Sequence, residues 1–147
     1  MNLNEHNIEL NQTFNDKNKA IRRAGELLVE SGSVSPEYIE AMLEREQIVS
    51  THMGNFVAIP HGTDEAKKHV RSTGISVIQV PFGVDFSENP NEEKMAMMIF
   101  GIAGVGDEHL ELLSKIAVLC SELDNVVKLV NAKDKAEIIQ LIEGVDL

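Results

Sequence analysis

The residue of this sequence best suited to chemistry is a histidine in a glycine-containing turn. His61 follows an apolar, β-branched run, Phe56–Ile59, which predicts a short buried strand that stops at Pro60. We therefore expect His61 at the carboxyl end of a strand, the edge where open α/β sheets carry their sites. Gly62 leaves the backbone beside the imidazole open, and Thr63 is placed to cap a short helix. An imidazole, an open backbone and a helix start at one point suit a bound or transferred anion.

A second histidine and an arginine are candidate partners for this group. His109 also follows a predicted strand, so parallel strands would bring both imidazoles to one sheet edge. A neutral imidazole, with an ordinary pKa of about 6.5, is a competent nucleophile near neutral pH. Phosphoryl transfer needs in-line positioning and stabilisation of the equatorial oxygens, which Arg45, His109 and the amides after Gly62 can supply. Two plainer interpretations stay open: a solvent-exposed His109, and an Arg45 that pairs with surface carboxylates.

A zinc site is the alternative chemistry for the same residues. Two histidines and a carboxylate can bind a catalytic zinc ion, and His61 and His109 with an acidic residue would provide that set. The two histidines do not stand at the i, i+4 spacing that places two ligands on one helix face. We therefore expect no metal and no cofactor. The cluster of Met95, Met97 and Met98 is interpreted as core packing.

The elements that must position these residues alternate between helical and strand patterns. Because helices and strands intermingle, the pattern predicts an α/β fold in which helices cover both faces of a sheet. The cap signals are Asn15 or Asp16 for the first helix, Ser35 with Pro36 for the second, and Asp107 and Asp134 later in the chain. The predicted strands are 8–10, 56–59, 74–80 with an extended arm at 82–86, and 95–103; the predicted helices are 16–31, 36–47, 64–69, 107–120, 124–132 and 134–143.

Length, charge and composition exclude several classes of function. The chain has 147 residues, 43% of them hydrophobic, which predicts one domain over residues 1–147 with a single core. No apolar run is long enough to span a bilayer, and no basic-then-apolar leader is present, so we expect a cytoplasmic protein without direct membrane insertion. A net charge of −11 argues against nucleic acid and favours a partner with a positive patch. Cys120 is the only cysteine, which excludes an internal disulfide.

The sequence resembles a known bacterial family over most of its length. The segment Ala41–Ala66, which contains the motif Pro-His-Gly-Thr, is similar to the active-site block of the mannitol/fructose-type enzyme IIA domains, and of the mannitol-specific members in particular. These domains belong to the phosphoenolpyruvate-dependent sugar phosphotransferase system. The likeness runs from Ile8 to Glu143 and is also dense at Gly101–Leu113. The fold that it implies is a mixed, mostly parallel five-stranded sheet with helices on both faces. The chain differs in a bulky Phe56–Val57 pair and in the loop Gly104–His109.

The resemblance implies a role for each candidate residue. In the family, the histidine of the motif accepts a phosphoryl group from HPr and passes it to the enzyme IIB domain, a role that falls to Nε2 of His61. The second active-site histidine falls at His109 and the motif arginine at Arg45, with Gly62 and Thr63 expected to bind the phosphate. The implied partners are HPr as donor and the IIB domain of a mannitol transporter as acceptor, with no cofactor. A nitrogen-type regulatory IIA, which docks other proteins according to its phosphorylation, and a fructose-specific IIA stay open as alternatives.

Overall fold

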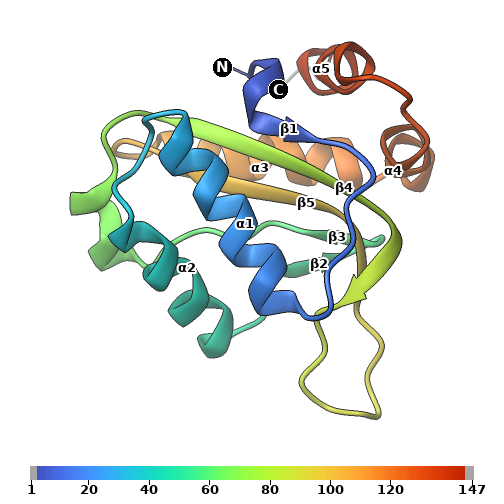
Figure 1. Cartoon of the computed structure of the whole chain (residues 1–147), viewed down its shortest axis with the longest axis horizontal. Coiled ribbons are helices and arrows are strands. Elements are labelled where there is room, and N and C mark those ends of the chain that lie inside the picture. The colour runs from blue at the N-terminus through green and yellow to red at the C-terminus, as the bar shows by residue number, and fades with distance from the viewer. Residues whose placement is uncertain (1–2, 145–147) are drawn as a thin grey trace.

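A five-stranded mixed sheet lies at the centre of the structure, and helices cover both of its faces (Figure 1). This computed structural model describes residues 3–144. The strand order is β1-β4-β5-β3-β2; β1 pairs with β4 and β3 with β5 in parallel, whereas β4–β5 and β2–β3 are antiparallel. The expected mixed α/β sheet is therefore confirmed. The strands are β1 (Ile8–Glu9), β2 (His52–Gly54), β3 (Val57–Ala58), β4 (Gly74–Asp85) and β5 (Met95–Ala103).

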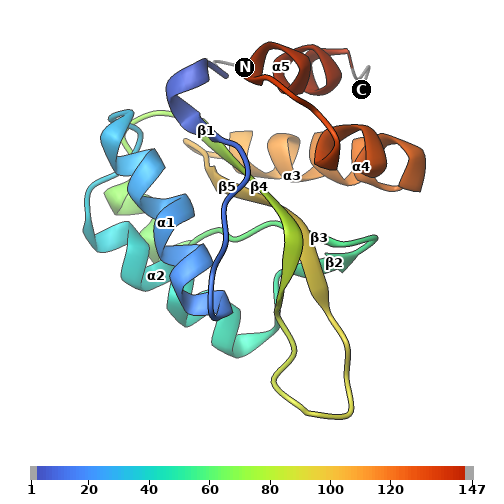
Figure 2. The same ribbon diagram turned by 45° about the vertical axis from the view of Figure 1, so that its right-hand side comes forward.

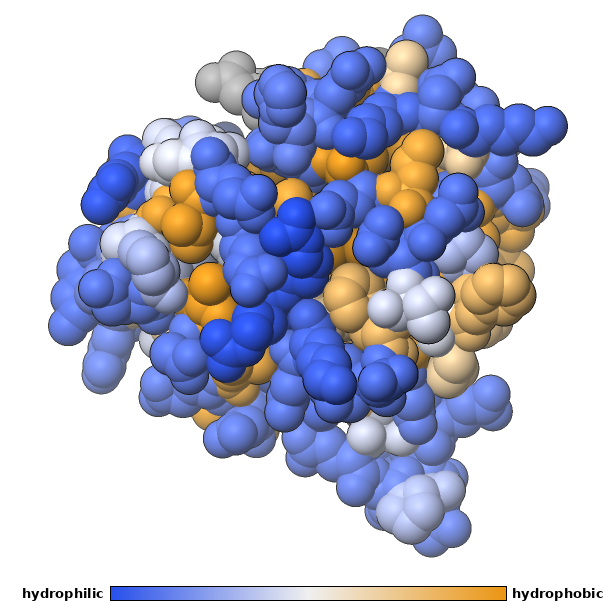
Figure 3. Space-filling view, viewed as in Figure 1, coloured by the Kyte–Doolittle hydropathy of each residue, from blue (hydrophilic) through white to orange (hydrophobic). Residues whose placement is uncertain are grey.

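The helices form two layers, one on each side of the sheet (Figure 2). The first layer holds α1 (Lys17–Glu30) and α2 (Glu37–Ile48). The second layer holds α3 (Glu108–Cys120), α4 (Leu123–Val130) and α5 (Lys135–Glu143). The chain also forms two short 3₁₀ helices, η1 (Glu5–Asn7) and η2 (Asp64–His69). Over α1, near the centre of Figure 3, mostly hydrophilic side chains face outward, as expected of an amphipathic surface helix. Between residues 3 and 144, no helix combines the length and the apolar character needed to cross a membrane.

The alternation of side chains along β5 divides the core between the two layers. Met98, Phe100 and Ile102 are buried on the side of α3, α4 and α5. Ile99 and Ala103 are buried on the opposite side, against α1 and α2. Because successive strand residues point to opposite faces, one nearly unbroken apolar strand supplies both cores. The boundaries of β5 agree with the sequence prediction of 95–103. Its buried side chains fix the carboxyl end of the strand, from which the segment with His109 continues.

The predicted helix starts are confirmed in position, but only two of them use the expected side-chain cap. The carboxylates of Asp16 and Asp134 accept backbone N–H groups three residues further on, at 2.9 and 2.8 Å. By contrast, Ser35, Thr63 and Asp107 make no side-chain cap, and the buried Oγ of Ser35 has no hydrogen-bond partner. Pro36 supplies a helix-compatible φ of −56° there without help from the serine side chain.

The segment before His61 is a hairpin, where the sequence predicted a single strand over 56–59. β2 and β3 are joined by Asn55 and Phe56, whose φ values of 49° and 66° both lie in the left-handed region. A two-residue loop with positive φ at both positions has the twist that joins antiparallel strands tightly. Phe56 is thus a turn residue with 46% of its surface exposed, and β3 is limited to Val57–Ala58. The prediction was wrong here because the usual glycine of such a turn is replaced by phenylalanine.

The predicted strand at 74–80 is longer in the structure. β4 continues through Pro81 to Asp85 and includes most of the extended arm expected at 82–86. Its register with β5 shifts between Gln79 and Val84, so the proline lies where the regular ladder is interrupted and its missing N–H costs little. The loop after this arm closes a long hairpin that points away from the carboxyl end of β5 (Figure 1).

Candidate active site

His61 lies just beyond the end of β3, beside the carboxyl-terminal part of β5. The N–H of Ile102 donates to the carbonyl oxygen of Pro60 at 2.9 Å, and His61 forms an isolated parallel bridge with Ile102. Because β3 and β5 run parallel, His61 is held at the edge of the sheet that the sequence predicted. Its ring is half-buried and lines a small cavity, so it is neither sealed in the core nor fully exposed.

The imidazole of His61 is held in one tautomer. Its Nδ1 lies 2.8 Å from the carbonyl oxygen of Ile59, and a carbonyl oxygen only accepts hydrogen bonds, so Nδ1 carries the proton. Burial lowers the pKa of His61, and the positive charges of Arg45 and His109 lower it further, against the opposing effects of the Ile59 carbonyl and Asp64. The ring is therefore neutral at pH 7, with an unprotonated lone pair on Nε2. This is the form of imidazole that attacks an electrophile.

His61 and His109 meet at this cavity, as the sequence predicted. The cavity is small, about 10 Å³, and both histidines line it. Nδ1 of His109 lies 3.0 Å from the carbonyl oxygen of Gly106, which orients its ring too. Gly104 permits the approach, since a Cβ there would collide with the backbone nitrogen of His109. The other residues around the cavity are Tyr38, Gly62, Thr63, Asp64, Lys67, Val70 and Gly104.

Arg45 lies near this cavity without lining it. Its charge contributes to the lowered pKa of His61, which puts the guanidinium within electrostatic range of the ring. Its Nη1 donates to the carbonyl oxygen of Val49 at 2.7 Å, just past the end of α2. The guanidinium thus satisfies a carbonyl oxygen at the carboxyl end of α2, and the side chain is half-buried.

The two residues predicted to bind phosphate lie at the cavity, with their backbone partly engaged. The N–H of Gly62 donates to Oη of Tyr38 at 2.8 Å. Thr63 precedes η2, where its carbonyl oxygen accepts from the N–H of Ala66 at 3.0 Å. The short helix expected after Thr63 is present as a 3₁₀ helix.

Sequence reasoning missed two residues of this site. Lys67, on η2, brings a further positive charge to the cavity, but the sequence gives no means to separate it from its neighbour Lys68. Tyr38 is a buried residue of α2. Its hydroxyl group nevertheless contacts the turn of His61. The available signal was that a buried phenol needs a hydrogen-bond partner.

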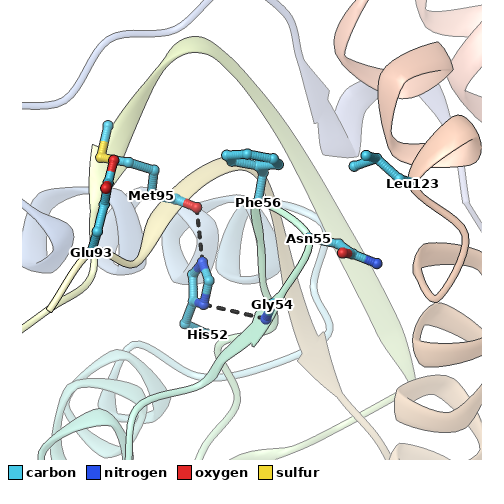
Figure 4. A pocket seen from close by; sticks show the side chains of 7 residues that line it. All are labelled: His52, Gly54, Asn55, Phe56, Glu93, Met95 and Leu123. Atoms are coloured by element: carbon cyan, nitrogen blue, oxygen red, sulfur yellow. Dashed lines mark hydrogen bonds between the residues drawn. The ribbon is translucent and has the colours of Figure 1, made fainter.

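A larger pocket lies elsewhere and lacks the chemistry for an anion. It has a volume of about 410 Å³ beside the β2–β3 turn, where His52, Phe56 and Glu93 are among its lining residues (Figure 4). Both ring nitrogens of His52 are engaged: Nε2 lies 2.8 Å from the carbonyl oxygen of Met95, and Nδ1 accepts from the N–H of Gly54 at 3.3 Å. Because neither imidazole nitrogen of His52 is free, this pocket does not suit phosphoryl transfer. The smaller cavity at His61 does.

The described residues also bear on the zinc alternative. Within residues 3–144, no group of three or more histidine, cysteine, aspartate or glutamate side chains is arranged to hold a metal ion. His61 and His109 therefore lack a third ligand there. The cavity is lined by the imidazoles of His61 and His109, by Lys67 and by Asp64, and Arg45 lies nearby. The lysine and the arginine attract an anion to this place.

Comparison with known proteins agrees with this arrangement. The family model described as "Phosphoenolpyruvate-dependent sugar phosphotransferase system, EIIA 2" matches residues 1–145. The mannitol-specific phosphotransferase enzyme IIA component of Enterococcus faecalis is 58% identical over 139 residues, which cover 95% of each chain. That of Bacillus subtilis is 47% identical over 144 residues, 98% of each chain. The Escherichia coli enzyme IIA of mannitol, solved in complex with its phosphorylated enzyme IIB, superposes with a TM-score of 0.90 at 36% identity, over 97% of this chain and 98% of that one. The chain therefore belongs to the EIIA 2 family of the phosphoenolpyruvate-dependent sugar phosphotransferase system.

Proposed function

We propose that this chain acts, as one cytoplasmic domain, as a phosphocarrier that accepts a phosphoryl group from phospho-HPr on Nε2 of His61. It then passes the group to the IIB component of a mannitol transporter. One observation carries the proposal: the Nδ1–H of His61 donates to the carbonyl oxygen of Ile59 at 2.8 Å, which leaves Nε2 as the nucleophile. The ring lines a cavity that it shares with His109.

The transfer step follows from this tautomer. The lone pair of Nε2 attacks the phosphorus atom, the new N–P bond forms, and the bond between phosphorus and the donor atom of HPr breaks. The electron pair of the broken bond stays on the donor, so no proton has to leave His61. The ring gains positive charge as the bond forms, and the carbonyl oxygen of Ile59 stabilises that charge through the Nδ1–H. In the next step, a nucleophile of IIB attacks the phosphorus atom and the N–P bond breaks. Its electron pair returns to Nε2, which restores the neutral ring.

The surrounding groups suit the negative charge of the phosphoryl oxygens. We assign this role to Arg45 and His109, whose charges already act on His61. Lys67 adds a positive charge at the cavity wall. The backbone at Gly62 and Thr63 is proposed to contact the phosphoryl group as well. In the unphosphorylated structure, the Gly62 amide is held by Tyr38.

The assignment of the partner and of the sugar depends on the relatives. Two relatives, at 58% and 47% identity, are mannitol-specific, which supports a transport role over the regulatory and fructose alternatives. The superposed Escherichia coli protein was solved with its phosphorylated IIB partner, which supports IIB as the acceptor. The negative net charge of −11 favours partners that carry a positive patch.

Incubation with phosphoenolpyruvate, enzyme I and HPr tests the proposal. We expect one acid-labile, alkali-stable phosphate per chain, transferable to a mannitol IIB domain and less efficiently to a fructose IIB domain. His61→Ala should remove the label, whereas His6→Gln, at an exposed histidine in η1, should keep it. A wild-type chain that takes up no phosphate, or a His61→Ala chain that is labelled normally, would overturn the proposal. Efficient labelling without onward transfer to any IIB domain would favour the regulatory alternative.

A further inference from the structure

We propose that Tyr38 is a positioning residue for phosphoryl transfer, because its hydroxyl group ties together the backbone of the two segments that carry His61 and His109. The kinetic part of this inference rests on the proposed function. The geometric part concerns the free protein and is tested independently of any transfer.

One oxygen atom makes both connections. Oη of Tyr38 donates to the carbonyl oxygen of Ile102 at 2.8 Å and accepts from the N–H of Gly62 at 2.8 Å. Only 4% of Tyr38 is exposed, and its bond to Ile102 is buried, so loss of the hydroxyl group would leave that carbonyl oxygen without this donor. The bond to Gly62 is part-buried. The phenol therefore joins the residue directly after His61 to the end of β5.

The ring of Tyr38 fixes the same turn by contact. A Cβ at Gly62 would lie 2.6 Å from Cε1 of Tyr38, so the phenol lies directly against the bare backbone of the turn. On the other side, Ile102 is followed two residues later by Gly104, where an added Cβ would collide with the backbone of His109. Displacement of the phenol would consequently shift the backbone of both segments that carry the histidines.

The helix that carries Tyr38 also carries Arg45. The two residues are seven positions apart in α2, which is close to two turns, so they lie on nearly the same face. Anchoring Tyr38 to Gly62 and Ile102 therefore fixes the height and rotation of this face of α2 beside the cavity. A single side chain thus sets the relative placement of the three groups assigned to the transfer.

This anchor does not respond to pH in the range where histidine titrates. Burial raises the pKa of Tyr38 to about 12, so the hydroxyl stays protonated and keeps donating to Ile102. The charged or titratable groups that line the same cavity are His61, Asp64, Lys67 and His109, with Arg45 nearby. The raised pKa of Tyr38 comes instead from burial, opposed by the Gly62 N–H, so titration of these groups near neutral pH leaves the hydroxyl protonated. The tyrosine is thus suited to a constant geometric role.

Tyr38→Phe tests the role, because it keeps the ring against Gly62 and removes only the hydroxyl group. Without Oη, the Gly62 amide has lost its acceptor, and we expect the turn to relax and the bond between His61 and Ile59 to lengthen. In the free protein, ¹⁵N spectra of the imidazoles should then show His61 leaving the pure Nδ1–H tautomer. In transfer assays, kcat should fall about 10- to 100-fold, as small misplacements of reacting groups do, with KM for phospho-HPr changed less than about twofold.

Ser76→Ala is the matched control. Oγ of Ser76 donates to the carbonyl oxygen of Ala24 at 2.8 Å, a buried side-chain bond between β4 and α1 that does not reach the cavity. Both variants should lower the thermal midpoint, but Ser76→Ala should keep the wild-type His61 spectrum. Wild-type His61 signals in Tyr38→Phe, or an equal change in Ser76→Ala, would overturn the inference. If the wild-type chain takes up no phosphate, the proposed function fails, and the spectra alone still decide the role of Tyr38.

Discussion

Nδ1 of His61 lies 2.8 Å from the carbonyl oxygen of Ile59, two residues earlier in the chain. This contact is local, but the turn after β3 that makes it is held by hydrogen bonds to other parts of the chain. Pro60 is bonded to β5 through the N–H of Ile102, and Gly62 is bonded to Tyr38. The result is a half-buried, neutral imidazole whose Nε2 keeps its lone pair.

The first prediction concerns the titration of His61. Burial and two positive neighbours lower its pKa below the ordinary value of about 6.5, so the neutral ring should persist into mildly acid solution. Phosphoryl acceptance should be constant at neutral pH and fall only as the pH drops through this lowered pKa. An NMR titration of the His61 ring gives the pKa directly, and a value at or above 6.5 would contradict the account.

The same shift has a consequence for folding stability. The unfolded chain binds a proton on this histidine at a higher pH than the folded chain does, so the free energy of unfolding should rise with pH across this interval. The stabilisation is complete above about pH 6.5 and is lost as the pH falls toward the folded pKa. Urea unfolding of the wild type and of His61→Gln across this range should show a smaller pH slope for the variant. Parallel slopes for the two proteins would contradict the prediction.

The second prediction concerns Arg45. Its charge helps to lower the pKa of His61, so Arg45→Gln should raise that pKa and slow transfer, by about 10-fold or more if the guanidinium also contacts the phosphoryl group. Folding should be little affected, since the bond lost, to the carbonyl oxygen of Val49, is exposed. Arg22→Gln is the matched control at an exposed arginine of α1 that pairs with Glu40. Equal transfer rates for the wild type and Arg45→Gln would count against the role.

The third prediction concerns Gly62. An added Cβ would lie 2.6 Å from the Tyr38 ring, so Gly62→Ala should destabilise the fold by about 1–3 kcal/mol, the range of overpacked sites, and slow the labelling of His61. Thr63→Ala is the neighbouring control, because that side chain makes no cap, and its unfolding free energy should change by less than about 0.5 kcal/mol. Denaturant unfolding compares the two, and a Gly62→Ala chain as stable as Thr63→Ala would refute the close packing.

The fourth prediction concerns a buried carboxylate beside Arg45. Glu46 is 2% exposed and accepts from the N–H and Oγ1 of Thr51, at 2.8 and 2.6 Å, and from Nζ of Lys17 at 3.2 Å. Glu46→Ala leaves the buried Thr51 donors and the lysine without this partner and should cost about 3–5 kcal/mol. Glu44→Ala, at an exposed position of the same helix, should be near neutral in denaturant unfolding. Similar unfolding curves for both variants would show that the network is dispensable.

The sequence predicted those features that depend on local chemistry. Asp16 and Asp134 are good caps, and each caps its helix; the apolar run Met95–Ala103 is the strand β5. The positions of His61 and His109 at one edge followed from strand ends and glycines, which are also local signals. In these cases, the residues within one or two turns determine the structure.

Features that depend on tertiary register could not be predicted in the same way. The turn at Asn55 and Phe56 lacks the glycine that usually marks it, so only the pairing of β2 with β3 reveals it. Tyr38 is hydrogen-bonded to Gly62 and Ile102, which are 24 and 64 positions away, and no sequence spacing predicts bonds over such separations. Lys67 lines the cavity from η2, and the sequence does not distinguish it from its neighbour Lys68, which does not line it.

The site of phosphorylation on the ring tests the central claim most directly. The claim is that the bond between Nδ1 and the Ile59 carbonyl oxygen leaves Nε2 as the only nucleophile of His61. Labelling the histidines with ¹⁵N and phosphorylating the chain with phosphoenolpyruvate, enzyme I and HPr allows the nitrogen bonded to phosphorus to be identified by NMR. The account predicts phosphorus on Nε2 of His61, with Nδ1 still protonated. Phosphorus on Nδ1, or on another histidine, would contradict it.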